Sequence, residues 1–420
     1  MVLFFLHTPA PPRDSAALKY YRHFSVIPGM TSKTELKYVP GLDGLRGLAC
    51  LSVVLFHTDI VTKSHSALTP FKGGTYGVDL FFVLSGFLIT SILLNEYEKY
   101  SSFNFISFYI KRLLRLYPPI LISIVVFLLP LFITDRTTAI ANIVCLMTYT
   151  GDCFMVVQHF THLPYALLSG HTWSLAVEEQ FYLTFPFLLL LVLRAYSRKK
   201  QSNFISFYPA FLLLYIFVVV TCSILLGEWF YKFFLWRFFE IYLGTFVAMI
   251  YSRSYERFTA ETAFSNSVRT IVQQVCSNKI VLLTSILCSV CLIVYPAVFP
   301  GFMVKYNLLY VVFTLAASVL IVNAVYPNNR YYSGFISNKA LVSIGKFSYG
   351  LYLYTPFIAR KVNSVFFDDP FRNAKTMLIC DVIAVSVSLA FSYLSFTIIE
   401  KNILKLRHRI SFPQKQVAAA

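Results

Sequence analysis

Long apolar stretches, separated by short polar and basic segments, recur along the chain. Ten of them are long enough, or nearly so, to cross about 30 Å of hydrocarbon as helices. They lie at residues 45–60, 78–94, 116–133, 175–193, 210–226, 230–251, 280–298, 308–325, 341–358 and 378–399. Inside lipid a helix satisfies its own backbone polar groups. The pattern therefore predicts an all-α fold, a polytopic integral membrane protein with about ten transmembrane helices.

Composition and charge support a location in the cell membrane. Of the 420 residues, 57% are hydrophobic and 13% are charged, which is too apolar for a soluble protein of this size. The net charge of +17 is spread between the apolar stretches, so it indicates membrane topology and not a nucleic-acid partner. The positive-inside rule favours both termini in the cytoplasm. The segment that fits this orientation least well contains Arg360, Lys361, Arg372 and Lys375.

The polar segments at the two ends of the chain predict where the membrane domain begins and ends. Residues 1–38 contain several prolines and are expected to form a partly disordered cytoplasmic tail. Within this tail, Met30 resembles a natural start, and residues 1–29 an extension. Residues 39–409 are expected to form one membrane domain, and residues 410–420 a disordered tail. The opening MVLFFL lacks the basic residues and the length of a secretory signal peptide.

The first apolar stretch, RGLACLSVVLFH, has Arg46 and His57 at its ends. Eleven residues of helix separate them by about 16 Å of rise and about 20° of rotation, so both lie on one face. Arg46 is then expected near the cytoplasmic end and His57 beyond the midplane. Ionisable residues at such depth mark functional sites by default. The simpler alternatives are an interfacial anchor for Arg46 and a backbone partner for His57.

Two further stretches carry carboxylates that we expect near the level of His57. Asp79 lies near the start of GVDLFFVLSGFLIT, and Glu178 and Glu179 lie in HTWSLAVEEQFY. Adjacent helical residues point about 100° apart, so at most one glutamate is expected to face His57. A carboxylate on one ring nitrogen of a histidine fixes its tautomer and raises its basicity, as a general base requires. Alternatively, the helix dipole alone favours Asp79 at its position.

Three other features of the apolar stretches predict packing or pairing. Ser85 and Gly86 lack the surroundings of a nucleophile and are interpreted as small residues for close helix packing. Arg237 and Glu240 are spaced i, i+3 and predict an internal ion pair. The eight cysteines lie mostly in apolar stretches, and Cys288 and Cys291 form a CxxC without a second pair inside an apolar stretch, so helix packing is the simpler interpretation and no metal is expected.

A basic cluster lies in FISFYIKRLLRLYPP, which predicts an interfacial amphipathic helix followed by a proline-marked entry to the third apolar stretch. Lys111, Arg112 and Arg115 form this cluster, and Arg46 is expected on the same side. Attraction to anionic lipid is the simpler interpretation. The sharper one is a site for a phosphorylated cofactor, which suits the forked donors of arginine.

The outer segment between the third and fourth apolar stretches is predicted to be polar and irregular. It holds Asp152, His159, His162 and His171. Solvated histidines are the commoner case in such loops, and acceptor binding is at least as plausible as metal ligation.

Taken in order, these motifs resemble the acyltransferase family 3 membrane proteins, which include bacterial glycan O-acetyltransferases. The matching segments are GLDGLRGLACLSVVLFH, GVDLFFVLSGFLIT, FYIKRLLRLYP, TWSLAVEEQFY, RFFEIYLG, GKFSYGLYLYTPF and IIEKNILKLR. The resemblance implies a ten-helix O-acyltransferase of the cell envelope. Such an enzyme moves an acyl group, usually acetyl, from cytoplasmic acyl-CoA to a hydroxyl of a glycan, a lipid-linked sugar or another surface acceptor.

The resemblance also implies roles for individual residues. His57 matches the family's essential histidine, as a general base or a transient acyl carrier, with Asp79 or Glu178 in support. Arg46, Arg112 and Arg115 match arginines beside the cofactor. Thr355 stands where many members have a histidine, which puts a direct role for that position in doubt. The alternative function is a proton-coupled transporter or exporter of a lipid-linked sugar, in which the buried histidine and acids relay protons.

Overall fold

The structure of the protein is a computed structural model, and it describes residues 38–62, 69–161, 168–197, 204–226, 234–252, 263–294, 308–366 and 374–406. Nearly all of these residues are helical, and no strand occurs among them. The helices are α2 (Pro40–Thr62), α3 (Tyr76–Tyr100), α4 (Phe105–Ser123), α5 (Leu131–Thr134), α6 (Arg136–Thr148), α7 (Gly151–Thr161), α8 (Trp173–Ser197), α9 (Phe204–Leu226), α10 (Phe234–Tyr251), α12 (Ala263–Ser277), α13 (Lys279–Val294), α15 (Leu308–Val325), α16 (Arg330–Ile336), α17 (Lys339–Phe366), α18 (Ala374–Ser395) and α19 (Lys401–Leu406). Short 3-10 turns precede α3 and α8, at Thr69–Thr75 and Gly170–Thr172.

Each predicted apolar stretch overlaps a helix, which confirms the all-α class. Among the residues that the structure describes, four helical segments are long and apolar enough to cross a membrane: Lys72–Tyr100, Gly170–Arg194, Leu308–Val325 and Lys375–Leu406. The pair Ser267–Ser277 and Lys279–Val294, bent by 66°, would make a fifth crossing if it is one span. The chain is therefore a multi-pass membrane protein, whereas ten spans and cytoplasmic termini stay predictions. The two predicted tails lie almost wholly outside the described residues.

Two local expectations were wrong. The prolines of FISFYIKRLLRLYPP do not mark a separate entry to the third apolar stretch, because α4 continues through Pro118 and Pro119 and then enters a π-helical segment at Ile124–Leu128. A helix can accommodate proline where its neighbours and local π geometry satisfy the freed backbone groups. The outer segment expected to be irregular contains α6 and α7. Asp135 starts α6 by accepting from the backbone N–H of Thr138 at 3.0 Å.

The most extensive helix pair joins α2 to α17. A Cβ atom on Gly345 would lie 1.8 Å from the backbone oxygen of Asp43, so only glycine permits this approach. Farther along, the Cys50 thiol donates to the backbone oxygen of Ser348 at 3.3 Å. Later residues of α2 thus contact later residues of α17, so the two helices run parallel.

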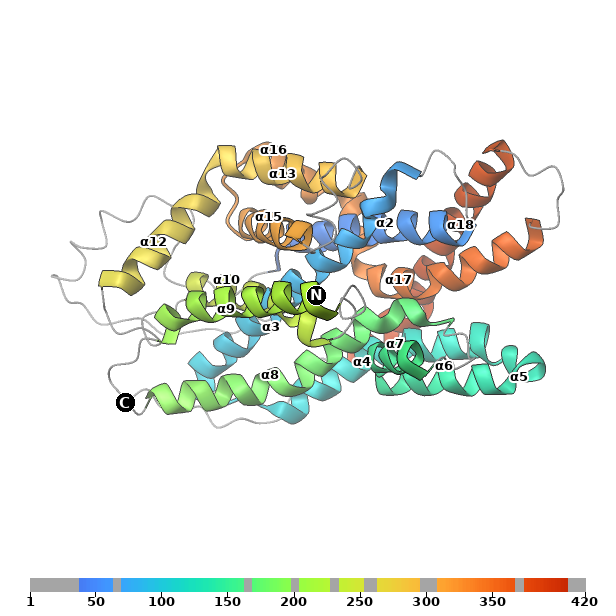
Figure 1. Ribbon diagram of the computed structural model, residues 1–420, viewed down its shortest axis with the longest axis horizontal. Coiled ribbons are helices and arrows are strands. Elements are labelled where there is room, and N and C mark those ends of the chain that lie inside the picture. Colours follow the sequence, from blue (N-terminus) through green and yellow to red (C-terminus); the bar gives the residue numbers. More distant parts are fainter. Residues whose placement is uncertain are drawn as a thin grey trace.

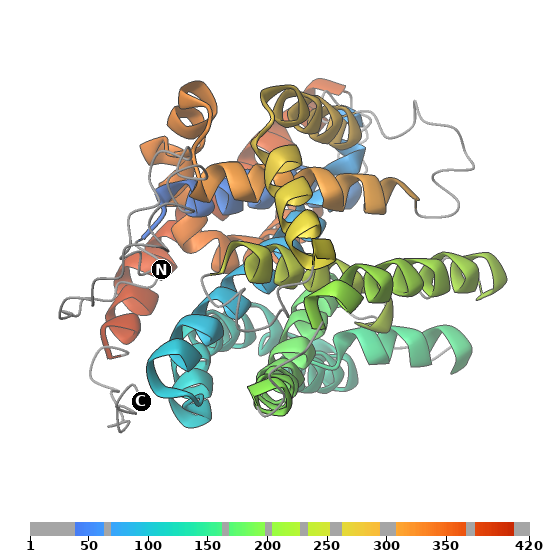
Figure 2. The same cartoon turned by 90° about the vertical axis from the view of Figure 1, so that its left-hand side faces the viewer.

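The remaining helices surround this pair. Figure 1 shows α5, α6 and α7 gathered at one end of the molecule and α12 at the other. The turned view in Figure 2 shows α4 and α8 on one side of the layer formed by α2, α15 and α17. Large apolar side chains are exposed on α8, α9 and α18, for example Leu191, Leu213 and Leu394. Exposed apolar side chains of this kind suit a hydrocarbon environment.

Candidate active site

His57 lies against a second histidine and a tyrosine. The His57 ring centroid is 5.9 Å from that of His171, in the turn before α8, and 6.3 Å from that of Tyr352, on α17. Both contacts are edge-to-face, at 70° and 72°. Three segments that are distant in the sequence therefore converge at His57.

His171 is a buried residue, and not the solvated loop residue that the sequence suggested. Its Nε2 lies 3.1 Å from the backbone oxygen of Leu353. The Tyr352 hydroxyl donates to the backbone oxygen of His171 and lies 2.7 Å from the Ser174 hydroxyl. The turn is buried because it packs beneath α17. Asp152 is also buried, whereas the side chain of His159 and all of His162 lie outside the described residues.

Glu178 lies one helical turn beyond Ser174 and collects three donors. Its Oε1 accepts from the Ser85 hydroxyl at 2.6 Å and from the Tyr182 hydroxyl at 2.7 Å. The Nη2 of Arg112 lies 3.4 Å from the same oxygen. Ser85, interpreted from the sequence as a packing residue, therefore also orients a carboxylate. Glycine at the next position does serve packing, because a Cβ there would lie 1.9 Å from the Ile241 backbone oxygen.

Glu179 forms the stronger pair with Arg112. The Nε of Arg112 lies 3.0 Å from each carboxylate oxygen, and Nη2 lies 2.7 Å from Oε1. The guanidinium also stacks 3.1 Å above the Tyr182 ring. The positive charge of Arg115 interacts electrostatically with the carboxylates of Glu179 and Glu400. Both glutamates thus face Arg112, although their side chains leave α8 in different directions.

Asp79 belongs to a separate buried cluster. Its Oδ1 accepts from Nη2 of Arg237 at 2.6 Å, and Nη1 of Arg237 lies 2.8 Å from Oε1 of Glu240. The predicted pair of Arg237 and Glu240 is confirmed, and Asp79 completes a triad that has no more than 1% of each side chain exposed. A buried arginine needs carboxylates around it, which explains why Asp79 pairs with Arg237 and not with His57.

The three residues expected at one level are consequently separated. Glu178 is hydrogen-bonded to Ser85, which follows Asp79 by six residues, or about 9 Å of rise along α3. The ring of His57 contacts those of His171 and Tyr352. Whether His57, Asp79 and Glu178 act in catalysis stays a prediction.

Arg46 has an acidic partner that sequence reasoning missed. Its Nη1 lies 3.4 Å from Oδ1 of Asp43, and 13% of its side chain is exposed. The Tyr38 hydroxyl donates to Oδ2 of the same carboxylate at 2.9 Å. Partial burial and the charge of Asp43 raise the pKa of Tyr38 to about 12. The i, i+3 spacing of Asp43 and Arg46 was the available signal.

Together these residues form a series of polar groups through the helical core, which we call the polar series. It consists of His57, His171, Tyr352, Ser174, Glu178, Tyr182, Arg112, Glu179 and Arg115. One end offers imidazoles suited to proton transfer, and the other offers arginines suited to anionic groups. Within the part of the chain that the structure describes, no cluster of three or more His, Cys, Asp or Glu side chains could hold a metal ion.

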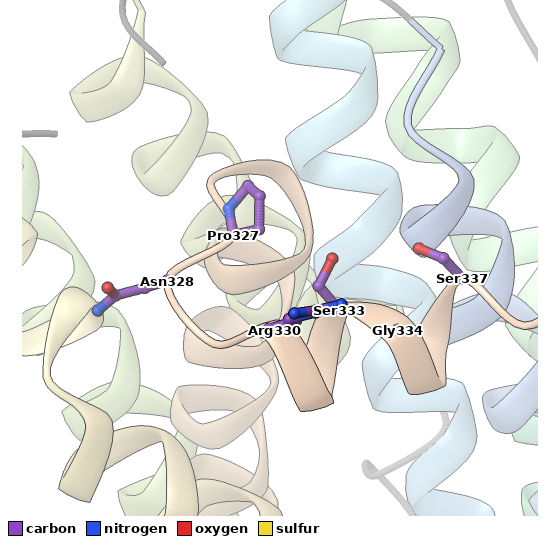
Figure 3. A pocket seen from close by; sticks show the side chains of 6 residues that line it. All are labelled: Pro327, Asn328, Arg330, Ser333, Gly334 and Ser337. Carbon is purple, nitrogen blue, oxygen red and sulfur yellow. The ribbon is translucent and has the colours of Figure 1, made fainter. Parts of the chain in front are cut away.

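A surface hollow lies apart from these residues. Figure 3 shows it between α15 and α16, lined by Pro327, Asn328, Arg330, Ser333, Gly334 and Ser337. None of the residues predicted for catalysis or cofactor binding lines it.

Comparison with known proteins agrees with the order of the motifs. Residues 39–397 match the acyltransferase family 3 model, described as an acyltransferase domain. A protein provisionally named an O-acetyltransferase in Staphylococcus aureus (strain COL) is 35% identical over 183 residues, 42% of this chain and 29% of its own length. The O-acetyltransferase OatA of Staphylococcus aureus (strain NCTC 8325 / PS 47) is 30% identical over 341 residues, 79% of this chain and 52% of its own length.

The chain spans about half, or less, of the length of these relatives. No solved structure matches it significantly. The family match nevertheless extends over most of the chain and includes every residue of the polar series. The chain belongs to the acyltransferase family 3 of membrane proteins.

Proposed function

We propose that the protein is a membrane O-acetyltransferase that moves an acyl group from cytoplasmic acyl-CoA to a hydroxyl of a cell-envelope glycan or lipid-linked sugar. The observation that carries the proposal is the polar series, which joins the His57 imidazole to Arg112 and Arg115 through the helical core. Family membership and the names of the relatives support the type of reaction.

In this reaction the acceptor hydroxyl attacks the carbonyl carbon of the thioester. The new C–O bond forms, the C–S bond breaks, and His57 removes the hydroxyl proton as general base. The same proton then passes to the departing thiolate. In the covalent alternative, His57 first carries the acyl group and then releases it to the hydroxyl. The half-buried ring of His57 suits both routes, because it is accessible yet confined by Tyr352 and His171.

The arginines supply charge for the phosphates of acyl-CoA. Arg112 is already shared by Glu178 and Glu179, so its main contribution is to hold α4 against α8. Arg115 and Arg46, which belong to two other parts of the family motifs, are the better candidates for direct phosphate contacts. Glu178 supports the reaction by fixing the polar series, whereas Asp79 supports it by fixing α3 against α10.

Acyl transfer is tested by comparing the parent protein with His57→Gln in nanodiscs, using radiolabelled acetyl-CoA and a glycan acceptor. We expect the variant to remain folded and to lose acyl transfer by a factor on the order of 10²–10⁴, the usual share of general acid–base catalysis. Transfer at the parental rate by the folded variant contradicts the role of His57. Label retained on the parent but absent from the variant supports the covalent route.

The transporter alternative makes a different prediction. A proton relay through His57 and Glu178 would give pH-driven movement of a lipid-linked sugar in proteoliposomes without any consumption of acetyl-CoA. We expect instead that thioester cleavage accompanies every modified acceptor molecule. Flux without cleavage would favour transport.

A further inference from the structure

His171 is a buried histidine with one ring nitrogen engaged and the other unpaired. Only 6% of the residue is exposed. Its Nε2 lies 3.1 Å from the backbone oxygen of Leu353, and a carbonyl oxygen can only accept. Nε2 therefore carries the proton, and Nδ1 carries a lone pair. This Nδ1 is buried and makes no hydrogen bond.

The ring of His171 lies in a buried site beside a positive charge. Burial in an apolar environment disfavours an imidazolium, and so does a nearby positive charge. Arg360 supplies such a charge from α17, where it also donates to the backbone oxygen of Leu168. Among the described residues, the other titratable groups that face the ring are His57, from α2, and Tyr352, from α17. A neutral ring with its proton on Nε2 leaves Nδ1 as a permanent acceptor.

The position of the ring is fixed by two consecutive residues of α17. Tyr352 binds the backbone oxygen of His171, and Leu353 binds its ring. Phe357, one turn farther, packs edge-to-face at a centroid distance of 5.4 Å. Side chains held in this way keep the geometry that a functional site requires.

The ring of His171, which carries the unpaired Nδ1, lies beside the ring of His57. The two ring centroids are 5.9 Å apart. A direct N–H···N hydrogen bond of about 3 Å would bring the two ring centres to about 5 Å. Catalytic hydrogen bonds are often long in a free enzyme and shorten when substrate binds. A side-chain rotation that moves the His57 ring by about 1 Å brings the two ring centres to this distance.

We propose that His171 is a positioning residue for His57, whose N–H it accepts at Nδ1. This inference rests on the proposed acyl transfer through His57. The hydrogen bond holds His57 in the tautomer whose other nitrogen presents its lone pair to the acceptor hydroxyl. When the C–O bond forms, that nitrogen takes the hydroxyl proton, and the resulting imidazolium still donates to His171. The proton then leaves with the thiolate as the C–S bond breaks, and His171 never changes its charge.

Two isosteric substitutions separate the ring nitrogens. The Oδ1 of asparagine occupies the position of Nδ1, so His171→Asn keeps an acceptor for His57 and loses the bond to Leu353. The amide of glutamine reaches the position of Nε2, so His171→Gln keeps the bond to Leu353 and loses the acceptor. We expect His171→Gln to lower kcat on the order of 10²-fold with the KM for acetyl-CoA unchanged, and His171→Asn to stay within about tenfold of the parent.

The pattern of the two variants decides the outcome. Parental kcat in folded His171→Gln overturns the inference, as does an equal loss in both variants, which would indicate a structural role. If neither variant folds, ¹⁵N NMR of the histidine-labelled parent protein provides a second test. A proton on Nδ1 of His171 overturns the inference, whereas a proton on Nε2 supports it. Failure of acyl transfer in the parent, or full activity of His57→Gln, would instead contradict the proposed function.

Discussion

Arg112 donates to both carboxylate oxygens of Glu179, with its Nε 3.0 Å from each of them. Its Nη2 lies 2.7 Å from Oε1 of Glu179 and 3.4 Å from Oε1 of Glu178. One arginine of α4 thus neutralises two neighbouring carboxylates of α8. Less than one fifth of the side chain of Arg112 is exposed, at 19%, so water screens the pair only weakly.

Removal of this arginine should destabilise the protein. In Arg112→Ala, two largely buried carboxylates lose their cation, and we expect the free energy of unfolding to fall by about 3 kcal/mol. Thermal unfolding in detergent measures the loss. Arg115→Ala is the matched control from the same helix and should cost less stability while weakening acetyl-CoA binding. Equal unfolding temperatures for Arg112→Ala and the parent would contradict the structural role of Arg112.

The charge of Glu178 can be separated from its hydrogen bonds. In Glu178→Gln, the amide oxygen still accepts from Ser85 and Tyr182, so we expect a change in the free energy of unfolding of only about 1 kcal/mol. We expect acetyl transfer to fall at least tenfold, because the polar series loses one of the two negative charges beside Arg112. Ser85→Ala removes one hydrogen bond without removing the charge and should keep most of the activity. Full activity of folded Glu178→Gln would show that the charge is dispensable.

The triad of Asp79, Arg237 and Glu240 should behave as one unit. Arg237→Met leaves two carboxylates fully buried without a cation, and we expect a loss of about 3–5 kcal/mol in the free energy of unfolding. Combining it with Asp79→Asn and Glu240→Gln should recover part of this stability, because the uncompensated charges disappear. Chemical denaturation of the single and triple variants gives the comparison. A triple variant less stable than Arg237→Met would argue against charge as the cause.

Two glycines offer a matched test of helix packing. A methyl group on Gly345 would lie 1.8 Å from the Asp43 backbone oxygen, so Gly345→Ala must push α2 away from α17. We expect a cost of about 1–3 kcal/mol and a lower kcat, since His57 is displaced from Tyr352. A methyl group on Gly334 of α16 would meet nothing within 4 Å. Gly334→Ala should be neutral or stabilising by up to about 1 kcal/mol. Identical behaviour of the two variants would contradict close packing.

The periodic features of the sequence predicted the helices well. Apolar length marked the helical segments, and the i, i+3 spacing of Arg237 and Glu240 predicted their ion pair, because both signals are local. The predicted start of the third apolar stretch at Pro118 and Pro119 was wrong, since surrounding helices decide whether a proline marks a helix boundary or is accommodated within a helix.

The site could be predicted only in part, because pairings between helices leave no local signal. Asp79 was expected near His57 and binds Arg237, which is 158 positions away in the sequence. Glu178 was expected at the level of His57 and binds Ser85. His171 was taken for a solvated loop residue, and its contact with Leu353 depends on α17, which follows much later in the chain. His171 lies in the motif HTWSL and Leu353 lies in the motif LYLY, but neither motif shows that the two residues are in contact.

The parallel packing of α2 and α17 also constrains how the chain is threaded. Contacts advance in the same direction along both helices, from Asp43 and Gly345 to His57 and Tyr352. When both helices cross the bilayer, each begins on the same side of it. The segment that joins them must then traverse the bilayer an odd number of times. A topology map made with reporter fusions between the two helices has to show this parity, whatever the total number of crossings.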